Sequence, residues 1–220
     1  MLQNDRLKDY IDSLIPDNDI VIEEIRKKAA ADDMPIIRRD SEQLLKSILK
    51  MKNPQKILEI GTCVGYSAIV MAAYTEADTH ITTIEIGEKD YEMALDNVKK
   101  AGYEDKISCI LADATDVLKN YAECDERFDF IFMDAAKAQY INWLKDVTKI
   151  LKPGGVLLSD NILHDGDVIQ SRFAVERRDR TTHARLREYL YELTHSDDYM
   201  TSVLDAGDGM SISVRLGKEK

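Results

Sequence analysis

Two acidic residues and an asparagine follow short apolar runs in the second half of the sequence. Asp134 ends the run FDFIFMD, and Asp160 and Asn161 end the run GVLLSDN. If both runs are adjacent parallel strands, their carboxyl ends lie on one edge of a sheet and the three side chains converge. Oxygen ligands without a thiol or imidazole favour a hard cation, Mg²⁺ most naturally. The alternative is that Asp160 and Asn161 simply end a strand, where both residue types are common.

Lys137 stands three residues after Asp134, which is one helical turn away and on the same side. Beside a bound cation the charged ammonium is disfavoured, and a neutral lysine can take a proton from a hydroxyl. The spacing therefore predicts a base directed at a hydroxyl near the metal. A solvated lysine at the start of a helix is the alternative.

A glycine loop lies in LEIGTCVGYS, residues 58–67. Gly61 and Gly65 let the backbone turn sharply and approach a ligand, and Ser67 opens the expected helix, where free N–H groups gather. In an open α/β sheet, this crevice after the first strand binds ligands. The loop has neither the third glycine of a dinucleotide motif nor the lysine of a P-loop, so it favours a ligand without a pyrophosphate. A structural turn without a ligand is the alternative.

Two more acids end the next apolar runs. Glu85 lies 24 positions after Gly61 (85 − 61), where a carboxylate accepts hydrogen bonds from both hydroxyls of a ribose. Asp113 ends the third run, and with Ala114 it can read an adenine through its carboxylate and the adjacent backbone N–H. The loop and these acids together predict a site for ribose and adenine, although a strand-end glutamate can also be merely solvated.

The elements that position these residues alternate in periodicity. Short runs rich in Ile, Val and Phe are typical of buried parallel strands, and amphipathic stretches separate them. The predicted strands are 56–61, 80–86, 106–113, 128–134 and 155–161, and the predicted helices include 68–74, 90–101 and 138–151. This alternation indicates a doubly wound α/β sheet.

The two ends of the chain depart from that alternation. Residues 199–206 and 210–216 flank the turn Gly207-Asp208-Gly209 and predict a β-hairpin, so the sheet should end in antiparallel strands. Residues 3–50 predict helices that cover the cofactor side. Asp40 or Ser41 is the expected N-cap of the last of these helices.

The composition limits the class of protein. The 220 residues are 44% apolar and 32% charged, which is typical of one globular domain. The densely charged N-terminus predicts no signal peptide, and no apolar run reaches the ~20 residues of a membrane span, so we expect a cytoplasmic protein without membrane contact. Three cysteines without a C-x-x-C pair favour neither disulfides nor zinc. A net charge of −11 argues against a protein that coats nucleic acid.

Taken together, the motifs EIGTxxGYS, a strand-end glutamate, DAAKxxY and SDN resemble the metal-dependent O-methyltransferases that include catechol and caffeoyl-CoA methyltransferases. The resemblance implies a Rossmann-like class I methyltransferase fold in one domain (1–220), with a helical cap (1–50) on a core (51–220). The implied core is a mostly parallel seven-stranded sheet with helices on both faces. A homodimer through the N-terminal helices is implied as well.

The resemblance also implies ligands and roles for individual residues. The methyl donor is S-adenosylmethionine (SAM), contacted by Ile37, Gly61, Ser67, Glu85, Asp113, Ala114 and Asp134. Mg²⁺ or another divalent cation is held by Asp134, Asp160 and Asn161, and the catalytic base is Lys137.

Within the family, residues 34–37, 134–140 and 207–213 are similar to bacterial tRNA methyltransferases that convert wobble 5-hydroxyuridine to 5-methoxyuridine. A basic segment fits such a substrate. It contains Arg172, Arg177, Arg178, Arg180, Arg185 and Arg187 with only two acids, a local charge of +4 (6 − 2). With Arg38 and Arg39 it would form a rim that binds the phosphates of a tRNA anticodon loop. A salt-bridged, solvated helix is the alternative.

A wobble base is single-stranded and can be splayed into a pocket. Tyr140, Trp143 and Phe173 are candidates to stack on it, and each is equally compatible with a core position. Two other functions stay open: methylation of a small catechol-like molecule, which would not need the arginines, and SAM binding without catalysis.

Overall fold

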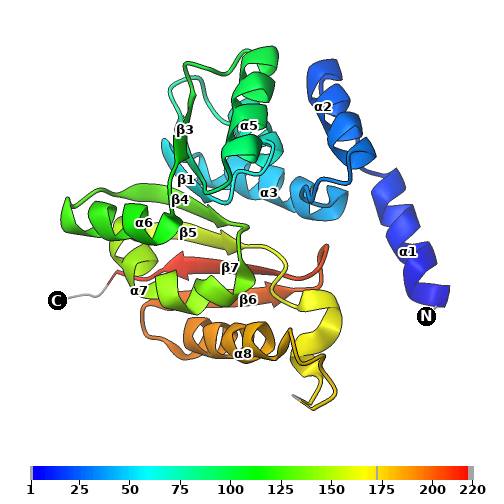
Figure 1. Ribbon diagram of the computed structural model, residues 1–220, viewed down its shortest axis with the longest axis vertical. Helices are drawn as coiled ribbons and strands as arrows, with labels where there is room; N and C mark the ends of the chain where they lie inside the picture. The colour runs from blue at the N-terminus through cyan, green and yellow to red at the C-terminus, as the bar shows by residue number, and fades with distance from the viewer. Residues whose placement is uncertain (1, 172, 218–220) are drawn as a thin grey trace.

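The computed structural model describes residues 2–171 and 173–217, and Arg172 of the basic segment lies outside them. One sheet crosses the molecule with helices on both faces (Figure 1). The helices are α1 (Leu2–Ser13), α2 (Ile20–Ala31), α3 (Arg39–Lys52), α4 (Tyr66–Ala73), α5 (Glu88–Ala101), α6 (Ala114–Glu123), α7 (Tyr140–Ile150) and α8 (Arg180–His195), with short 3-10 helices η1 (Lys137–Gln139) and η2 (His164–Ile169). The strands are β1 (Lys56–Ile60), β2 (His80–Glu85), β3 (Ile107–Leu111), β4 (Phe128–Met133), β5 (Leu151–Ser159), β6 (Tyr199–Leu204) and β7 (Met210–Arg215).

The order of the strands creates the crevice that the sequence predicted. The seven strands lie in the order β3-β2-β1-β4-β5-β7-β6. β1 to β5 pair in parallel, and β7 pairs antiparallel with both β5 and β6. This confirms the predicted doubly wound sheet with a C-terminal hairpin. The chain reverses its direction of growth between β1 and β4, and such a switch point opens a crevice at the carboxyl ends of the strands.

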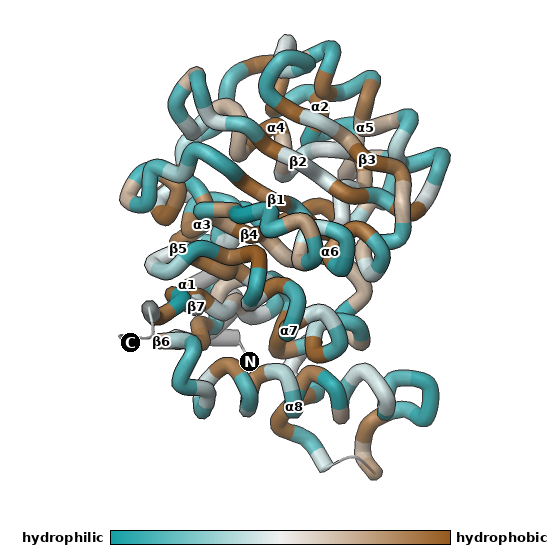
Figure 2. Tube along the Cα trace, turned by 90° about the vertical axis from the view of Figure 1, so that its left-hand side faces the viewer, coloured by the Kyte–Doolittle hydropathy of each residue, from teal (hydrophilic) through white to brown (hydrophobic). Residues whose placement is uncertain are grey.

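Alternating side chains of the central strands fill two cores, one on each face of the sheet. On β1, Ile57 packs into the core under α2 to α5, and Leu58 into the core under α6 to α8. On β4, Phe132 packs into the first of these cores and Met133 into the second. Strands that are buried on both faces appear in the sequence as continuous apolar runs. This is why these strands could be predicted from the sequence. Hydrophilic segments of the chain lie mainly at the outer turns (Figure 2).

The predicted end of one helix was wrong. The third predicted helix was expected to run to Leu151, but α7 ends at Ile150 because Leu151 already pairs with Phe128 of β4. The Pro-Gly-Gly segment that was expected to follow a helix lies inside β5, where the register shifts between Phe128 and Phe130. Leu151 and Val156 pair with β4 on either side of this segment, so the segment forms an irregularity within the strand and does not end a helix.

The predicted N-cap of α3 was also wrong. The helix begins at Arg39 after Arg38, and no side chain caps it. The Asp40 carboxylate instead accepts a hydrogen bond from the N–H of Gly207 at 2.7 Å. This bond joins the N-terminal helical cap to the turn between β6 and β7. Gly207 lies 167 residues after Asp40, so rules for helix ends that use only neighbouring residues do not predict the bond.

The N-terminal helix α1 extends along one side of the molecule (Figure 1). Leu7, Tyr10 and Ile11 of this helix, and Leu14 directly after it, are all more than two-fifths exposed. The homodimer expected from the resemblance stays a prediction, and this helix offers apolar area for it. No helix in the described part of the chain is long and apolar enough to cross a membrane. The three cysteines are free thiols.

The crevice depends on a close backbone approach at Gly61. This residue has a φ of +99°, and a Cβ added to it would lie 2.2 Å from the carbonyl oxygen of Asp134. Its N–H donates to the carbonyl of Ile84 at 3.1 Å, so its position is held from the β2 side as well. Any side chain at this position would push the end of β4 away from the β1 loop.

We therefore predict that Gly61→Ala lowers the free energy of unfolding by about 3 kcal/mol, the sum of backbone strain and overpacking. Gly102→Ala is the matched control, because Gly102 also has a positive φ (+73°) but no atom within 4 Å of the added Cβ. Its cost should be about 1 kcal/mol, from strain alone. Urea unfolding measures both variants, and equal losses would show that the close approach is not what limits residue 61.

Candidate active site

Two adjoining cavities occupy the crevice at the switch point. The first, about 430 Å³, lies toward the ends of β4 and β5. The second, about 400 Å³, lies toward the ends of β2 and β3. Pro35, Gly61, Cys63, Asp134 and Ala135 line both cavities, so they form the boundary between them. We refer to them as the acidic cavity and the nucleoside cavity.

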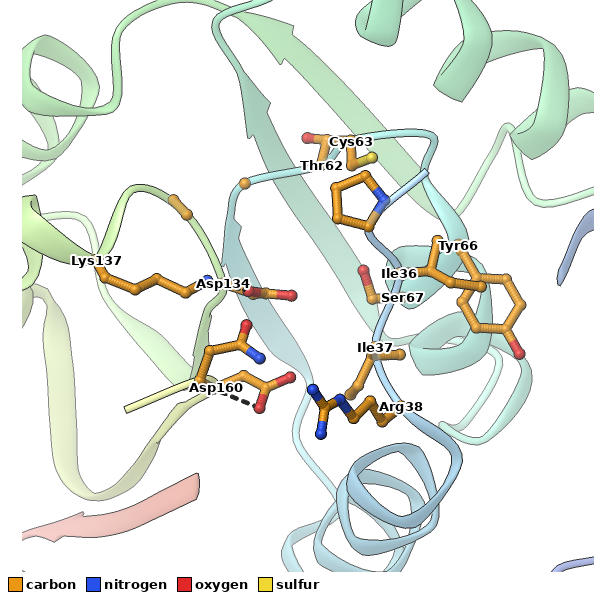
Figure 3. Close-up of a pocket in the computed structure, with 14 residues that line it drawn as sticks. Ile36, Ile37, Arg38, Thr62, Cys63, Tyr66, Ser67, Asp134, Lys137 and Asp160 are labelled. Atoms are coloured by element: carbon orange, nitrogen blue, oxygen red, sulfur yellow. Dashed lines mark hydrogen bonds and ion pairs between the residues drawn. The ribbon is translucent and has the colours of Figure 1, made fainter. Parts of the chain in front are cut away.

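The acidic cavity is built on two neighbouring strand ends. Asp134 follows β4 and Asp160 follows β5, and both line the cavity with Asn161 and Lys137 (Figure 3). Tyr140, fully buried beneath them, fixes the two strand ends. Its hydroxyl lies 3.0 Å from the carbonyl oxygen of Met133 and 3.2 Å from that of Asp160. Tyr140 therefore supports the site from the core and is not available to stack on a substrate base.

The two carboxylates repel each other in a poorly solvated place. Asp160 is only 2% exposed. Burial, followed by the negative charge of Asp134, raises the pKa of Asp160 to about 7. A dication between them would remove this repulsion. Within the described residues, no three His, Cys, Asp or Glu side chains are placed to hold a metal, so the donor set would be two carboxylates and the Asn161 amide. Such oxygen donors, completed by water or substrate, fit Mg²⁺.

Lys137 faces this acid pair. It is the first residue of η1, and its Nζ lies 2.7 Å from Oδ1 of Asp134, with about one-fifth of each side chain exposed. The ammonium is therefore held at the wall of the cavity, beside the Asp134 carboxylate. In its neutral form, a lysine so placed can take a proton from a hydroxyl bound in the cavity.

The nucleoside cavity is organised by Glu85. One carboxylate oxygen accepts the N–H of Cys63 at 2.7 Å, and the other accepts those of Ile86 and Gly87, both at 2.9 Å. These bonds tie the glycine loop after β1 to the end of β2 and fix the orientation of the carboxylate. A carboxylate has about four acceptor sites, so capacity for a ribose hydroxyl remains.

The far end of the nucleoside cavity combines a polar helix start with apolar side chains. Asp113 caps α6 by accepting the N–H of Thr115 at 2.7 Å. Trp143, only 6% exposed, donates from its indole N–H to the Thr115 hydroxyl at 3.0 Å. Ile86 is 71% exposed, although it is apolar. Both Trp143 and Ile86 line the cavity, which can therefore hold a planar base against apolar surface.

The structure brings together all the residues expected to contact SAM. Ile37 and Ser67 line the acidic cavity, Glu85, Asp113 and Ala114 line the nucleoside cavity, and Gly61 and Asp134 line both. Sequence reasoning missed Pro35, Ile36, Thr62, Cys63 and Tyr66 on the acidic side, and Ile86 and Gln139 on the nucleoside side. It considered Trp143 only as a stacking partner for RNA or as core. An apolar residue directly after a strand-end acid was a usable signal for Ile86.

The expected basic rim is only partly present. Arg38 lines the acidic cavity, whereas Arg39 turns toward the α1–α2 loop, where it lies 3.2 Å from Asp17. Arg180 donates to the carbonyl of Val175. Arg185 and Arg187 likewise donate to backbone carbonyls, so these three guanidinium groups hold the fold around α8.

Arg177 and Arg178, the other two arginines of the basic segment that the structure describes, are exposed. Arg178 pairs with Glu176 and Asp179, as the alternative interpretation anticipated. Arg177 is exposed, and neither it nor Arg178 lines either cavity. Phe173 is 86% exposed and lies beyond both cavities as well.

A carboxyl group is buried directly beneath the glycine loop. Glu59 of β1 has no exposed surface, and burial raises its pKa to about 8. The hydroxyl of Thr83 lies 2.5 Å from its Oε2, and the Thr62 hydroxyl lies 2.5 Å from that of Thr83. Thr62 lines the acidic cavity, so this chain of hydrogen bonds connects the core of the sheet to the floor of the site.

Comparison with known proteins agrees with this arrangement. Residues 13–216 match a family model described as O-methyltransferase. The chain is 31% identical to caffeoyl-CoA O-methyltransferase of Medicago sativa, over 98% of this chain and 91% of that protein. It is 31% identical to caffeoyl-CoA O-methyltransferase 2 of Populus trichocarpa, again over 98% and 91%. The crystal structure of an O-methyltransferase from Bacillus cereus in complex with SAH, the demethylated form of SAM, has a TM-score of 0.83 at 25% identity, covering 96% and 97%.

The fold and the paired cavities define a class I, Rossmann-like methyltransferase. The chain belongs to the O-methyltransferase family and is a SAM-dependent O-methyltransferase of the caffeoyl-CoA type. This confirms SAM as the methyl donor and the predicted enzyme class, and it argues against SAM binding without catalysis. The divalent cation stays a prediction.

The buried carboxyl of Glu59 predicts a pH-dependent stability. Its pKa is raised from 4.5 to about 8 on folding, so only the unfolded chain releases this proton between these values. Stability is therefore lost as pH rises through this window, by about 1.4 kcal/mol per pH unit from this residue. Glu59→Gln should flatten the decline measured by urea unfolding at pH 5.5, 6.5 and 7.5. Glu104→Gln, at an exposed site, serves as the control, and parallel curves for Glu59→Gln and wild type would contradict the assignment.

Proposed function

We propose that the enzyme transfers the methyl group of SAM to a hydroxyl that has a second oxygen beside it, using a divalent metal. The observation that carries the proposal is that Asp134, Asp160, Asn161 and Lys137 line one cavity, and that Asp134 also borders the nucleoside cavity. The donor and acceptor of the methyl group would thus meet at the boundary of the two cavities.

The roles of the residues follow from their positions. A divalent cation on Asp134, Asp160 and Asn161 would supply Lewis-acid stabilisation of a deprotonated hydroxyl. In its neutral amine form, Lys137 would receive the proton of the hydroxyl at Nζ. Glu85 and Asp113 orient the nucleoside of the donor, while Gly61 permits its approach to the sheet. Alignment of the two reactants contributes much of the rate enhancement.

The acceptor that we propose is 5-hydroxyuridine at the wobble position of tRNA. Its 5-hydroxyl stands beside the 4-carbonyl, which gives the required pair of adjacent oxygens. In support, the sequence motifs resemble the tRNA-modifying members of the family, and Arg38 lines the acidic cavity (Figure 3), where its guanidinium also donates to the carbonyl of Gly207 at 3.2 Å. The exposed Arg177 could contact phosphates beyond the cavity, and the exposed Arg178 could do so by exchanging its ion pairs with Glu176 and Asp179 for a phosphate.

A small catechol-like acceptor is the second candidate. The curated relatives described above carry the name caffeoyl-CoA O-methyltransferase. Three arginines of the basic segment are engaged with backbone carbonyls, which leaves fewer for RNA. A catechol would occupy the same cavity without needing contacts with the other arginines of that segment.

The test is a methyl-transfer assay with labelled SAM and Mg²⁺, offering tRNA that carries 5-hydroxyuridine and, in parallel, a simple catechol. We expect label in the tRNA, lost with EDTA and restored by excess Mg²⁺. The charge-removing variant Arg177→Gln/Arg178→Gln should weaken transfer to tRNA and leave transfer to catechol unchanged. Efficient transfer to the catechol alone would select the second candidate.

Lys137→Met should lower kcat about 10²- to 10⁴-fold, the usual contribution of a general base, with little change in SAM affinity. Its control is Lys145→Met, an exposed lysine on α7 that lines neither cavity. Single-turnover kinetics on a saturating acceptor measure the effect. If Lys137→Met retained the wild-type rate, another group would have to receive the proton.

A further inference from the structure

A buried polar cluster joins the N-terminal cap to the helix that follows the glycine loop. At its centre is the side chain of Asn18, in the loop between α1 and α2. The Asn18 amide nitrogen donates to Glu42 at 2.8 Å and to Glu23 at 3.1 Å. Its amide oxygen accepts from the Lys46 ammonium at 2.5 Å and from the Tyr74 hydroxyl at 3.1 Å. One side chain therefore connects α2, α3 and the end of α4.

The cluster is costly to disturb because its charges are desolvated. Glu42 is 2% exposed and Lys46 is 4% exposed, and the two form an ion pair one helical turn apart. Removing one partner from such a group leaves a buried charge or donor uncompensated, whereas the complete group fixes a single arrangement. The N-terminal helical cap is thus held in one position against the core.

Tyr66 carries this arrangement to the active site. It is the first residue of α4, is 2% exposed, and lines the acidic cavity beside Ser67. Its hydroxyl donates to Oε2 of Glu42 at 2.7 Å and lies 3.3 Å from the Asn18 amide nitrogen. In Figure 3 the Tyr66 ring points away from Asp134 and Asp160, toward the cap. The start of α4 is therefore anchored from behind by residues that do not line either cavity.

We propose that Asn18 and Glu42 are positioning residues for SAM, acting through the hydroxyl of Tyr66 on the loop and helix start from Gly61 to Ser67. The inference rests on SAM lying against this loop, but neither on the metal nor on the identity of the acceptor. Because coupling between two sites is reciprocal, SAM must also stabilise the docked position of residues 14–23. The N-terminal segment is in this way part of the SAM site without touching SAM.

The first test measures SAH binding by calorimetry, which needs neither metal nor acceptor. Asn18→Ala and Tyr66→Phe should each raise the Kd for SAH about ten-fold. Both act on one connection, so the double variant should also show about ten-fold weaker binding, not the roughly hundred-fold expected of independent sites. Unchanged affinity in the single variants, or multiplying effects in the double variant, would overturn the proposal.

Tyr74→Phe is the matched control. It removes another tyrosine hydroxyl bonded to Asn18, in this case to the amide oxygen, but Tyr74 lines neither the acidic nor the nucleoside cavity. We expect lower thermal stability with the Kd for SAH unchanged. If Tyr74→Phe weakened SAH as much as Tyr66→Phe does, the effect would be general destabilisation of the cap and the proposal would fail.

A second test uses the wild-type protein, in case Asn18→Ala does not fold. Hydrogen exchange with and without saturating SAH should show slower exchange of residues 14–23 in the complex, although no residue of that segment lines either cavity. In Tyr66→Phe this protection should be lost while protection of the glycine loop persists. Equal exchange of residues 14–23 in both states of the wild-type protein would refute the coupling.

Discussion

The loop after β1 and the end of β4 meet at Gly61, where an added Cβ would lie 2.2 Å from the carbonyl oxygen of Asp134. The rest of the site depends on this contact. It brings Asp134 to the boundary of both cavities. On the other side, the bond from the Gly61 N–H to the Ile84 carbonyl holds the loop beside Glu85, whose carboxylate accepts the Cys63 N–H. The donor site and the acidic cluster therefore share one piece of backbone, so neither can move without the other.

The acidic residues after β4 and β5 interact unfavourably in the folded protein. Asp160 is almost fully buried beside Asp134, and Lys137 offsets only part of the repulsion. The Tyr140 hydroxyl beneath them keeps the strand ends in place despite that repulsion. Glu59 adds a second buried carboxyl behind the glycine loop. Perturbed acids gathered at one sheet edge are typical of sites that bind charged ligands or perform chemistry.

The helical cap is joined to the core by polar contacts as well as by apolar packing. Asn18 gathers buried groups from three helices, and the Asp40 carboxylate holds the N–H of Gly207 in the β6–β7 turn. The same turn accepts the backbone N–H groups of Ile162 and Leu163, directly after the acidic cluster. Cap, hairpin turn and acidic loop thus form one continuous support around the acidic cavity.

The sequence by itself determined the alternating strands, the glycine loop and the strand-end acids, because local periodicity and residue type decide these features. It therefore gave the positions of Glu85, Asp134 and Asp160 at one sheet edge. Tertiary structure decided what depends on distant partners. Leu151 became a strand residue because β4 offered it a partner, and Asp40 bonds Gly207 instead of capping its own helix. Arg39 and Arg180 satisfy backbone carbonyls that only folding brings near them, so their charge in the sequence did not reveal their role.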